Sequence, residues 1–175
     1  MTRILDEIEA CIPALRRYAR ALTRDVSLAD DLVQDCLERA LRKQTLWRPT
    51  ASVRSWLFSI LLNIRRDDLR RERRAPAPLP VDTLAAEPAT GEAQSARLAA
   101  IEVSAAIATL PPDQREALLL VVLEDFSYGE AAAALGIPLG TLMSRIGRAR
   151  EQLREATERT PPARPTQPAR LRTVK

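Results

Sequence analysis

The sequence predicts an all-helical protein made of two small domains joined by a proline-rich linker. Apolar residues recur at helical spacing through most of the 175 residues, whereas the alternation that marks strands is scarce. Aromatic residues make up only 3% of the chain, so the cores must be aliphatic. Residues 75–92, APAPLPVDTLAAEPATGE, hold four prolines and a glycine, which indicates a flexible linker. We therefore expect an N-terminal helical bundle at 1–74, a C-terminal four-helix domain at 93–156 and a disordered basic tail at 157–175.

The N-terminal domain should begin with two amphipathic helices. The first is predicted over residues 6–23, with Pro13 marking a restart of the helix near Cys11. Ser27 is the expected N-cap of the second helix, with Asp30 in the capping-box position. The inner face of the second helix comprises Ala29, Leu32, Val33, Cys36, Leu37 and Ala40. Its outer face carries Asp31, Gln34, Asp35 and Glu38, a pattern that fits either a partner surface or an ordinary solvated face.

A third helix should run from a cap at Ser52 to Arg74. Its first three turns are apolar, with Val53, Trp56, Leu57, Ile60, Leu61 and Ile64 packing on the first two helices. It then changes to RRDDLRRERR, residues 65–74, with six arginines and three acidic residues. Such a helix leaves the core and presents charge outward. Salt bridges within the helix would also explain this segment, without any ligand.

Residues 127–153, SYGEAAAALGIPLGTLMSRIGRAREQL, read as a helix-turn-helix. The first helix should end at a left-handed Gly136, because Ile137-Pro138 cannot continue it. Ala132 lets the two helices cross closely, and Leu142 fills the core between them. In the second helix the apolar face is Leu142, Ile146, Ala149 and Leu153, and Ser144, Arg145 and Arg148 face away from it. A plain helical hairpin with a solvated arginine face is the competing interpretation.

Acidic and basic residues are concentrated in different parts of the chain. The net charge is +4, yet residues 82–130 carry nine acidic residues and two arginines, a local balance of −7. Two basic segments, 65–74 and 145–154, therefore flank an acidic middle. Twenty-five of the 27 basic residues are arginines, which suits forked phosphate and guanine contacts, although a GC-rich genome would give the same bias.

Several classes of function are disfavoured by what the sequence lacks. The chain has no histidine and only Cys11 and Cys36, both on apolar helix faces, so we expect neither a zinc site nor a disulfide framework. No constellation for bond chemistry is present, and we expect no catalytic residues and no cofactor. The longest uncharged apolar run, residues 117–123, is too short to cross a bilayer, and the acidic N-terminus MTRILDEIE lacks an apolar core of signal-peptide length. We expect a cytoplasmic protein that is not inserted in a membrane.

Three segments in this order carry a resemblance to a known family. They are DDLVQDCLERAL, WLFSILLNIRRDDLRR and, after the linker, LPPDQREALLLVVLEDFSYGEAAAALGIPLGTLMSRIGRAREQLR. Together they resemble a bacterial RNA polymerase sigma factor of the extracytoplasmic-function (ECF) group of the sigma-70 family, over residues 10 to 155. The resemblance implies a sigma region 2 domain, which binds core polymerase and the −10 promoter element, and a sigma region 4 domain, which binds the −35 element.

The resemblance also assigns roles to the N-terminal domain. The second helix would dock on the β′ clamp of core RNA polymerase through Asp31, Leu32, Gln34, Asp35 and Glu38. The third helix would hold the melted −10 strand, with Asn63 contacting a base and Arg65, Arg66, Arg70 and Arg71 contacting phosphates, next to Trp56 and Asp67. Relatives often carry small or apolar residues at Arg65 and Arg66, which leaves open the side of the helix that faces DNA.

In the C-terminal domain, the resemblance places the recognition helix in the major groove of the −35 element. The residues implied are Thr141, Met143, Ser144, Arg145, Gly147, Arg148 and Arg150, of which Ser144 and Arg148 are the main hydrogen-bonding readers. An anti-sigma factor that covers these surfaces is the implied regulator. Two rival functions remain: a sigma mimic, which captures anti-sigma factors and usually carries a receiver domain, and a plain helix-turn-helix repressor.

Overall fold

The computed structural model describes residues 2–44, 52–72, 74 and 92–159. Within these ranges the chain forms seven α-helices and no strand, which confirms the all-helical prediction. The N-terminal helices are α1 (Thr2–Thr23), α2 (Val26–Lys43) and α3 (Val53–Glu72). The C-terminal helices are α4 (Glu92–Thr109), α5 (Pro112–Val122), α6 (Tyr128–Leu135) and α7 (Leu139–Arg159). Helix α7 continues three residues past the predicted domain end, and most of the predicted linker and tail lies outside the described residues.

Helix α1 is continuous, so the predicted restart near Cys11 is wrong. Pro13 lies inside the helix, and its side chain is exposed. The buried side chains of Ile8, Leu15 and Leu22 continue on both sides of it along one stripe. Proline cannot donate one of the backbone hydrogen bonds of the helix. Packing of the buried stripe on α2 and α3 compensates for that loss.

The N-cap of α2 is Asp25 and not the predicted Ser27. The Asp25 carboxylate accepts a hydrogen bond from the Leu28 backbone N–H at 3.0 Å. Arg24, at a left-handed φ of 61°, ends α1 so abruptly that the cap of the next helix lies two residues before the predicted one. Asp30 forms no capping box; its carboxylate lies 3.9 Å from Arg16 and 3.8 Å from Arg20 on α1. The cap at Ser52 of α3 is confirmed, since its hydroxyl accepts from the Ser55 N–H at 3.1 Å.

Both cysteines are free and lie against the core, as predicted. Cys36 is buried between α2 and α3, where its thiol donates to the Leu57 carbonyl at 3.4 Å. Burial raises the pKa of the Cys36 thiol to about 12. Cys11 is half-buried, and burial raises its pKa as well. Neither thiol is therefore a reactive thiolate at neutral pH.

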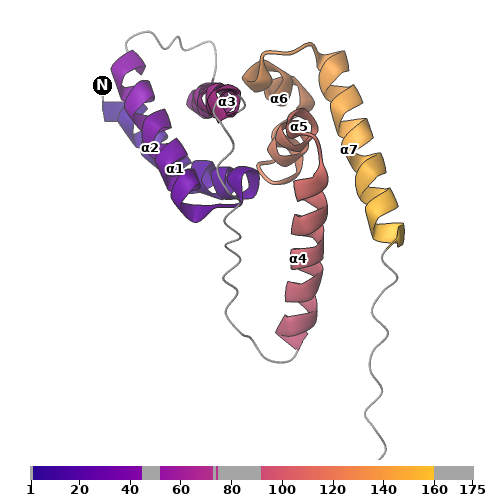
Figure 1. Ribbon diagram of the computed structural model, residues 1–175. Helices are drawn as coiled ribbons and strands as arrows, with labels where there is room; N and C mark the ends of the chain where they lie inside the picture. The colour runs from indigo at the N-terminus through magenta and orange to yellow at the C-terminus, as the bar shows by residue number, and fades with distance from the viewer. Residues whose placement is uncertain (1, 45–51, 73, 75–91, 160–175) are drawn as a thin grey trace, which may run out of the picture.

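The helix-turn-helix of α6 and α7 is confirmed in detail. Ser127 and Glu130 form a reciprocal capping box at the start of α6, and Gly136 ends it with a left-handed φ of 65°. Ala132 is buried and Leu142 is fully buried, as their positions in the motif predicted. Helix α4 runs beside α7 (Figure 1), which makes the C-terminal part a four-helix unit.

Replacing Gly136 with alanine should destabilise the protein by about 1–2 kcal/mol. The position has open space around it, so the cost comes from the left-handed backbone and not from a clash. Chemical denaturation followed by circular dichroism would measure it. The matched control is Gly147→Ala, which also meets open space but lies within α7 and should not destabilise.

Helix α3 lies between the two halves of the molecule and is buried on two sides. Its predicted inner face, with Leu57, Leu61 and Ile64, packs on α1 and α2. A second face next to it buries Phe58 and Leu62, and α6 contacts this helix from the C-terminal half (Figure 1). The sequence did not predict a second buried face, because the whole helix has only a weak amphipathic pattern.

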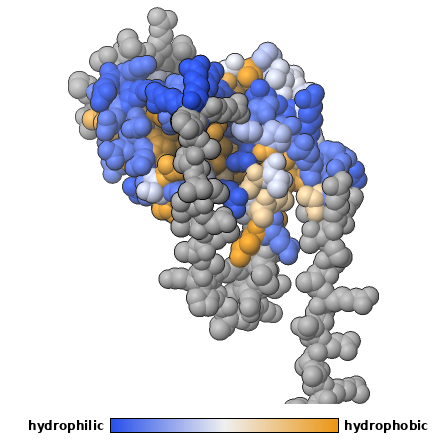
Figure 2. All heavy atoms as spheres, viewed as in Figure 1, coloured by the Kyte–Doolittle hydropathy of each residue, from blue (hydrophilic) through white to orange (hydrophobic). Residues whose placement is uncertain are grey.

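Aromatic rings join the two halves. Phe58 of α3 contacts Tyr18 of α1 and Phe126 of the α5–α6 connection, with ring centroids 5.2 and 5.0 Å apart. Three of the six aromatic residues in the chain therefore meet at one place. Figure 2 shows hydrophilic residues over most of the visible described surface, with apolar residues along α4. No described helix is long and apolar enough to cross a membrane.

Candidate polymerase and nucleic-acid interfaces

The outer face of α2 presents a continuous acidic surface. Asp31, Gln34, Asp35 and Glu38 are all exposed. Leu32, predicted to join them, is buried in the core, because successive helix residues point about 100° apart. Exposed apolar residues flank this surface at both ends, Leu28 and Leu41. Leu28 lies one turn before Leu32 and beside Asp31 and Asp35 in a groove of about 270 Å³. The sequence did hold a sign of this contact: Leu28 is an apolar residue that directly follows the predicted cap and does not belong to the inner face of the helix.

The predicted −10 residues divide between two sides of α3. Asn63 and Arg70 are exposed, Trp56 is half-buried, and Asp67 pairs with Arg70 at 3.3 Å. These four residues follow a spacing of seven, four and three, so they share one open face of the helix. Arg71 is exposed and pairs with Asp68 at 3.2 Å.

Arg65 and Arg66 are held by carboxylates and are less exposed than Asn63 and Arg70. Arg65 pairs with Glu72 at 3.1 Å, and 17% of its side chain is exposed. Arg66 donates to the Glu116 carboxylate of α5 from Nε at 3.1 Å and from Nη2 at 2.7 Å, and to the Leu135 carbonyl of α6 at 3.2 Å. The two arginines that made the orientation of α3 ambiguous are thus held by protein groups, and the face with Asn63 and Arg70 is left open.

Helix α7 exposes nearly the whole predicted −35 set. Leu142, Ile146 and Ala149 are buried against the domain. The opposite side carries exposed residues over two turns, namely Thr141, Met143, Ser144, Gly147, Arg148 and Arg150. Arg145 differs from them, because its Nε lies 3.3 Å from the Asp113 carboxylate of α5 and 23% of its side chain is exposed.

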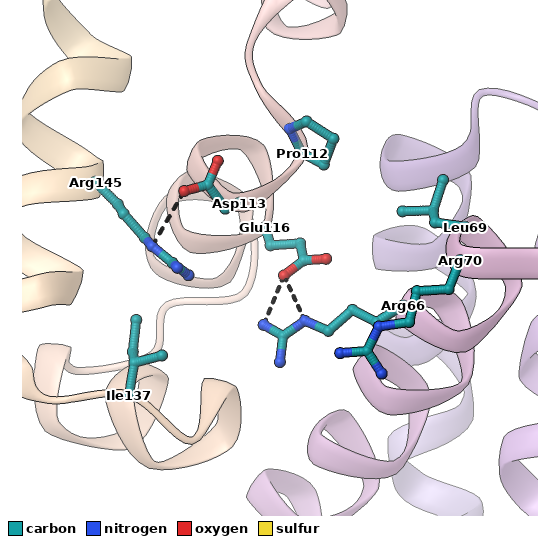
Figure 3. A pocket seen from close by; sticks show the side chains of 8 residues that line it. All are labelled: Arg66, Leu69, Arg70, Pro112, Asp113, Glu116, Ile137 and Arg145. Carbon is teal, nitrogen blue, oxygen red and sulfur yellow. Dashed lines mark hydrogen bonds and ion pairs between the residues drawn. The ribbon is translucent and has the colours of Figure 1, made fainter. Parts of the chain in front are cut away.

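A cleft of about 330 Å³ separates the cationic end of α3 from the C-terminal half. Figure 3 shows Arg66 reaching across it to Glu116, while Arg145 turns from α7 to Asp113. Asp113 and Glu116 thus place two carboxylates beside arginines of both predicted DNA-binding helices. Burial raises the pKa of the Glu116 carboxyl, and the hydrogen bond and charge of Arg66 oppose that rise.

A second buried carboxylate, Glu124, crosses between the halves. Its side chain is fully buried and accepts from Arg17 of α1 at 2.9 and 2.7 Å and from Arg54 of α3 at 3.1 Å. Arg54 also donates to the Glu124 carbonyl and lies 4.6 Å from the ring centroid of Phe126. Sequence reasoning missed Glu116 and Glu124. Their signal was a carboxylate set within the apolar run of residues 116–126, which needs a cation when buried.

Two family models match the chain in the same order as the two helical units. The model described as the Sigma2 domain of PhyR matches residues 8–62, and the model described as Sigma-70, region 4, matches residues 100–153. The ECF RNA polymerase sigma factor EcfG of Rhodopseudomonas palustris is 42% identical over 151 residues, which are 85% of this chain and 81% of that protein. The chain belongs to the ECF RNA polymerase sigma factors.

Solved structures agree with this assignment to the ECF sigma factors. The sigma factor RpoE of Bartonella quintana, solved in complex with the anti-sigma factor NepR, is similar with a TM-score of 0.74 and 33% identity, over 90% of this chain and 98% of that one. The anti-anti-sigma factor PhyR of the same organism has a TM-score of 0.59 over 86% of this chain and 49% of that chain. At 17% identity, the likeness to PhyR is one of fold.

Proposed function

We propose that this ECF sigma factor binds core RNA polymerase and directs initiation at specific promoters, reading duplex −35 DNA with α7 and melted −10 DNA with α3. The observation that carries the proposal is the presence of two separate exposed polar faces, one in each helical half. The proposal assigns no catalytic step to this chain, because a sigma factor supplies sequence specificity to the polymerase. We divide the chain into region 2 at 1–74, the linker at 75–92, region 4 at 93–156 and the tail at 157–175.

The acidic surface of α2 is the proposed site for core polymerase. Asp31, Gln34, Asp35 and Glu38 would contact the β′ clamp, and Leu28 replaces the buried Leu32 as the apolar contact of that site. A surface with exposed carboxylates around one leucine suits a partner that presents arginine or lysine beside an apolar side chain.

The open face of α3 is the proposed binding site for the −10 strand. Asn63 offers an amide that can both donate to and accept from an unstacked base, and the Trp56 ring provides apolar surface beside it. Arg70 and Arg71 are exposed at the end of the helix, where they can contact the strand backbone. Arg65 and Arg66 are also bound to carboxylates, but their side chains are only 17% and 27% exposed, so they are not available for this role in the present arrangement.

The exposed face of α7 is the proposed reader of the −35 element. Ser144 and Arg148 supply hydrogen bonds, Met143 supplies apolar contact, and Gly147 leaves room for close approach to the groove. Thr141, Arg145 and Arg150 would bind phosphates, for which Arg145 must first leave Asp113.

Replacing Arg148 with alanine should weaken binding to a −35 duplex by about 1–3 kcal/mol and relax the preference at one base pair. Fluorescence anisotropy with a set of single-base variants of the duplex measures both effects. The matched control is Arg154→Ala, in the same helix but beyond the last of the proposed reading residues, for which base preference should not change.

Regulation by an anti-sigma factor in the cytoplasm is part of the proposal. The similarity to RpoE, whose solved complex contains NepR, supports a partner of that class for this chain. A second candidate function, a sigma mimic that sequesters anti-sigma factors, is favoured by the match of residues 8–62 to the Sigma2 domain of PhyR. The 42% identity to an ECF sigma factor over 81% of its length favours the sigma factor.

Transcription from a random promoter library tests the proposal against both alternatives. Core RNA polymerase supplied with the purified, folded protein should produce transcripts that core polymerase alone does not produce. Absence of such transcripts, together with tight binding to an anti-sigma factor, would favour the mimic. Sequence-specific binding to duplex DNA without any binding to core polymerase would favour a plain helix-turn-helix repressor.

A further inference from the structure

The contacts between the two halves include several specific polar bonds. Glu124 and Glu116 come from the C-terminal half, and the arginines that bind them, Arg17, Arg54 and Arg66, come from the N-terminal half. Two further bonds follow the same boundary: Tyr18 donates to the Glu116 carbonyl at 3.1 Å, and Arg115 donates to the Leu22 carbonyl at 3.5 Å. Buried carboxylates are costly unless paired, so each depends on the other half for its partner.

The docked arrangement affects the two proposed DNA readers differently. On α7, Ser144, Gly147 and Arg148 stay exposed, so duplex DNA can reach them. On α3, Arg66 is bound, with 27% of its side chain exposed, and the cleft next to it also contains Arg70. The carboxylates of Asp113 and Glu116 line the same cleft. They repel the phosphates of any strand that approaches these arginines from that side.

From these contacts we propose that Glu116 and Glu124 hold the chain in a closed state in which the carboxylate of Glu116 occupies the place of a DNA phosphate on Arg66. In this state the −35 reader is accessible, and the site for the melted strand is blocked on one side. Opening the interface frees Arg66 and removes the two carboxylates from the path of the strand. The inference rests on the proposed function, because it uses the assignment of α3 to single-stranded DNA.

The variant Arg17→Gln separates the closed-state proposal from a simple effect of net charge on DNA binding. Arg17→Gln removes a positive charge, so simple electrostatics predicts weaker DNA binding. Arg17 lies on α1, outside the proposed DNA faces, and its side chain is 53% exposed. The closed-state proposal makes the opposite prediction, because loss of Arg17 deprives the buried Glu124 of one of its two arginines and favours the open form.

The test compares the full-length protein with Glu116→Gln/Glu124→Gln and with Arg17→Gln. Asp6→Asn/Glu9→Gln is the control, because it changes the net charge as the double glutamine variant does, at exposed positions of α1. The probes are a fluorescent single-stranded DNA of random sequence and a random duplex. Small-angle X-ray scattering gives the radius of gyration, and circular dichroism confirms that each variant is folded.

The double variant should bind single-stranded DNA about tenfold more tightly than the wild type, as expected when a minor open state becomes dominant. Its affinity for duplex DNA should change no more than in the control, and its radius of gyration should increase. Arg17→Gln should also increase the affinity for single-stranded DNA and the radius of gyration. It provides the test if the double variant does not fold. An unchanged radius of gyration, or a gain in single-strand affinity no larger than in the control, would overturn the proposal. Failure of transcription from the promoter library would instead reject the proposed function. The two failures are distinguishable, because the radius of gyration of the variants would still increase.

Discussion

Replacing Asp31 and Asp35 together with lysine is expected to weaken binding to core RNA polymerase by about 100-fold or more. Both side chains are exposed on one face of α2, so the change should leave the fold intact. If this face docks on a basic surface of the clamp, the variant places like charges opposite each other, which costs several kcal/mol. Copurification with tagged core polymerase and a competition assay against the wild type would measure the loss.

The matched control reverses Asp6 and Glu9 to lysine. These residues are exposed on α1, and the double reversal changes the net charge by the same amount. Its binding to core polymerase should stay within about threefold of the wild type, as expected for charges away from a contact. Equal losses in the two variants would show that net charge and not the α2 surface determines binding. Full binding by the Asp31 and Asp35 variant would remove the clamp assignment.

Replacing Phe58 with alanine should lower the free energy of unfolding by about 3–5 kcal/mol. Phe58 is fully buried and contacts both Tyr18 and Phe126, so its loss leaves a cavity where α1, α3 and the α5–α6 connection meet. For a chain of this size, such a loss corresponds to a fall in Tm of about 10 °C. Chemical denaturation and a thermal scan would measure the two quantities.

Phe58→Leu is the control for cavity formation. Leucine fills most of the site, and the expected loss is about 1.5 kcal/mol or less. If Phe58→Ala also lost no more than about 1.5 kcal/mol, the ring would not be part of a rigid core between the two halves.

Local patterns predicted the helix-turn-helix because its determinants are close in sequence. The buried Ala132, the left-handed Gly136 and the buried Leu142 were all predicted and lie within 11 residues of each other. The prediction of Ser27 as the N-cap of α2 was wrong because Asp25 and Ser27 are both residue types that cap helices well. The choice between them depends on the left-handed Arg24, which the residue type does not reveal.

The interface between the halves could not be predicted in the same way. Arg66 and Glu116 are 50 residues apart, and Arg17 and Glu124 are 107 residues apart. Arg66 in a cationic run looks like a DNA ligand, and only the tertiary structure places a carboxylate on it. For Leu32 the two predictions disagreed: helical spacing placed it on the inner face, which the structure confirms, whereas the resemblance placed it at the clamp.

The central claim is that one chain reads duplex DNA with α7 and an opened strand with α3. Permanganate footprinting, which modifies unpaired thymines, on a promoter selected from the library tests this most directly when combined with DNase protection. We predict protection of the −35 duplex and reactive thymines at −10 when core polymerase and this protein are both present, and neither with core polymerase alone. A duplex footprint without reactive thymines under any condition would contradict the claim.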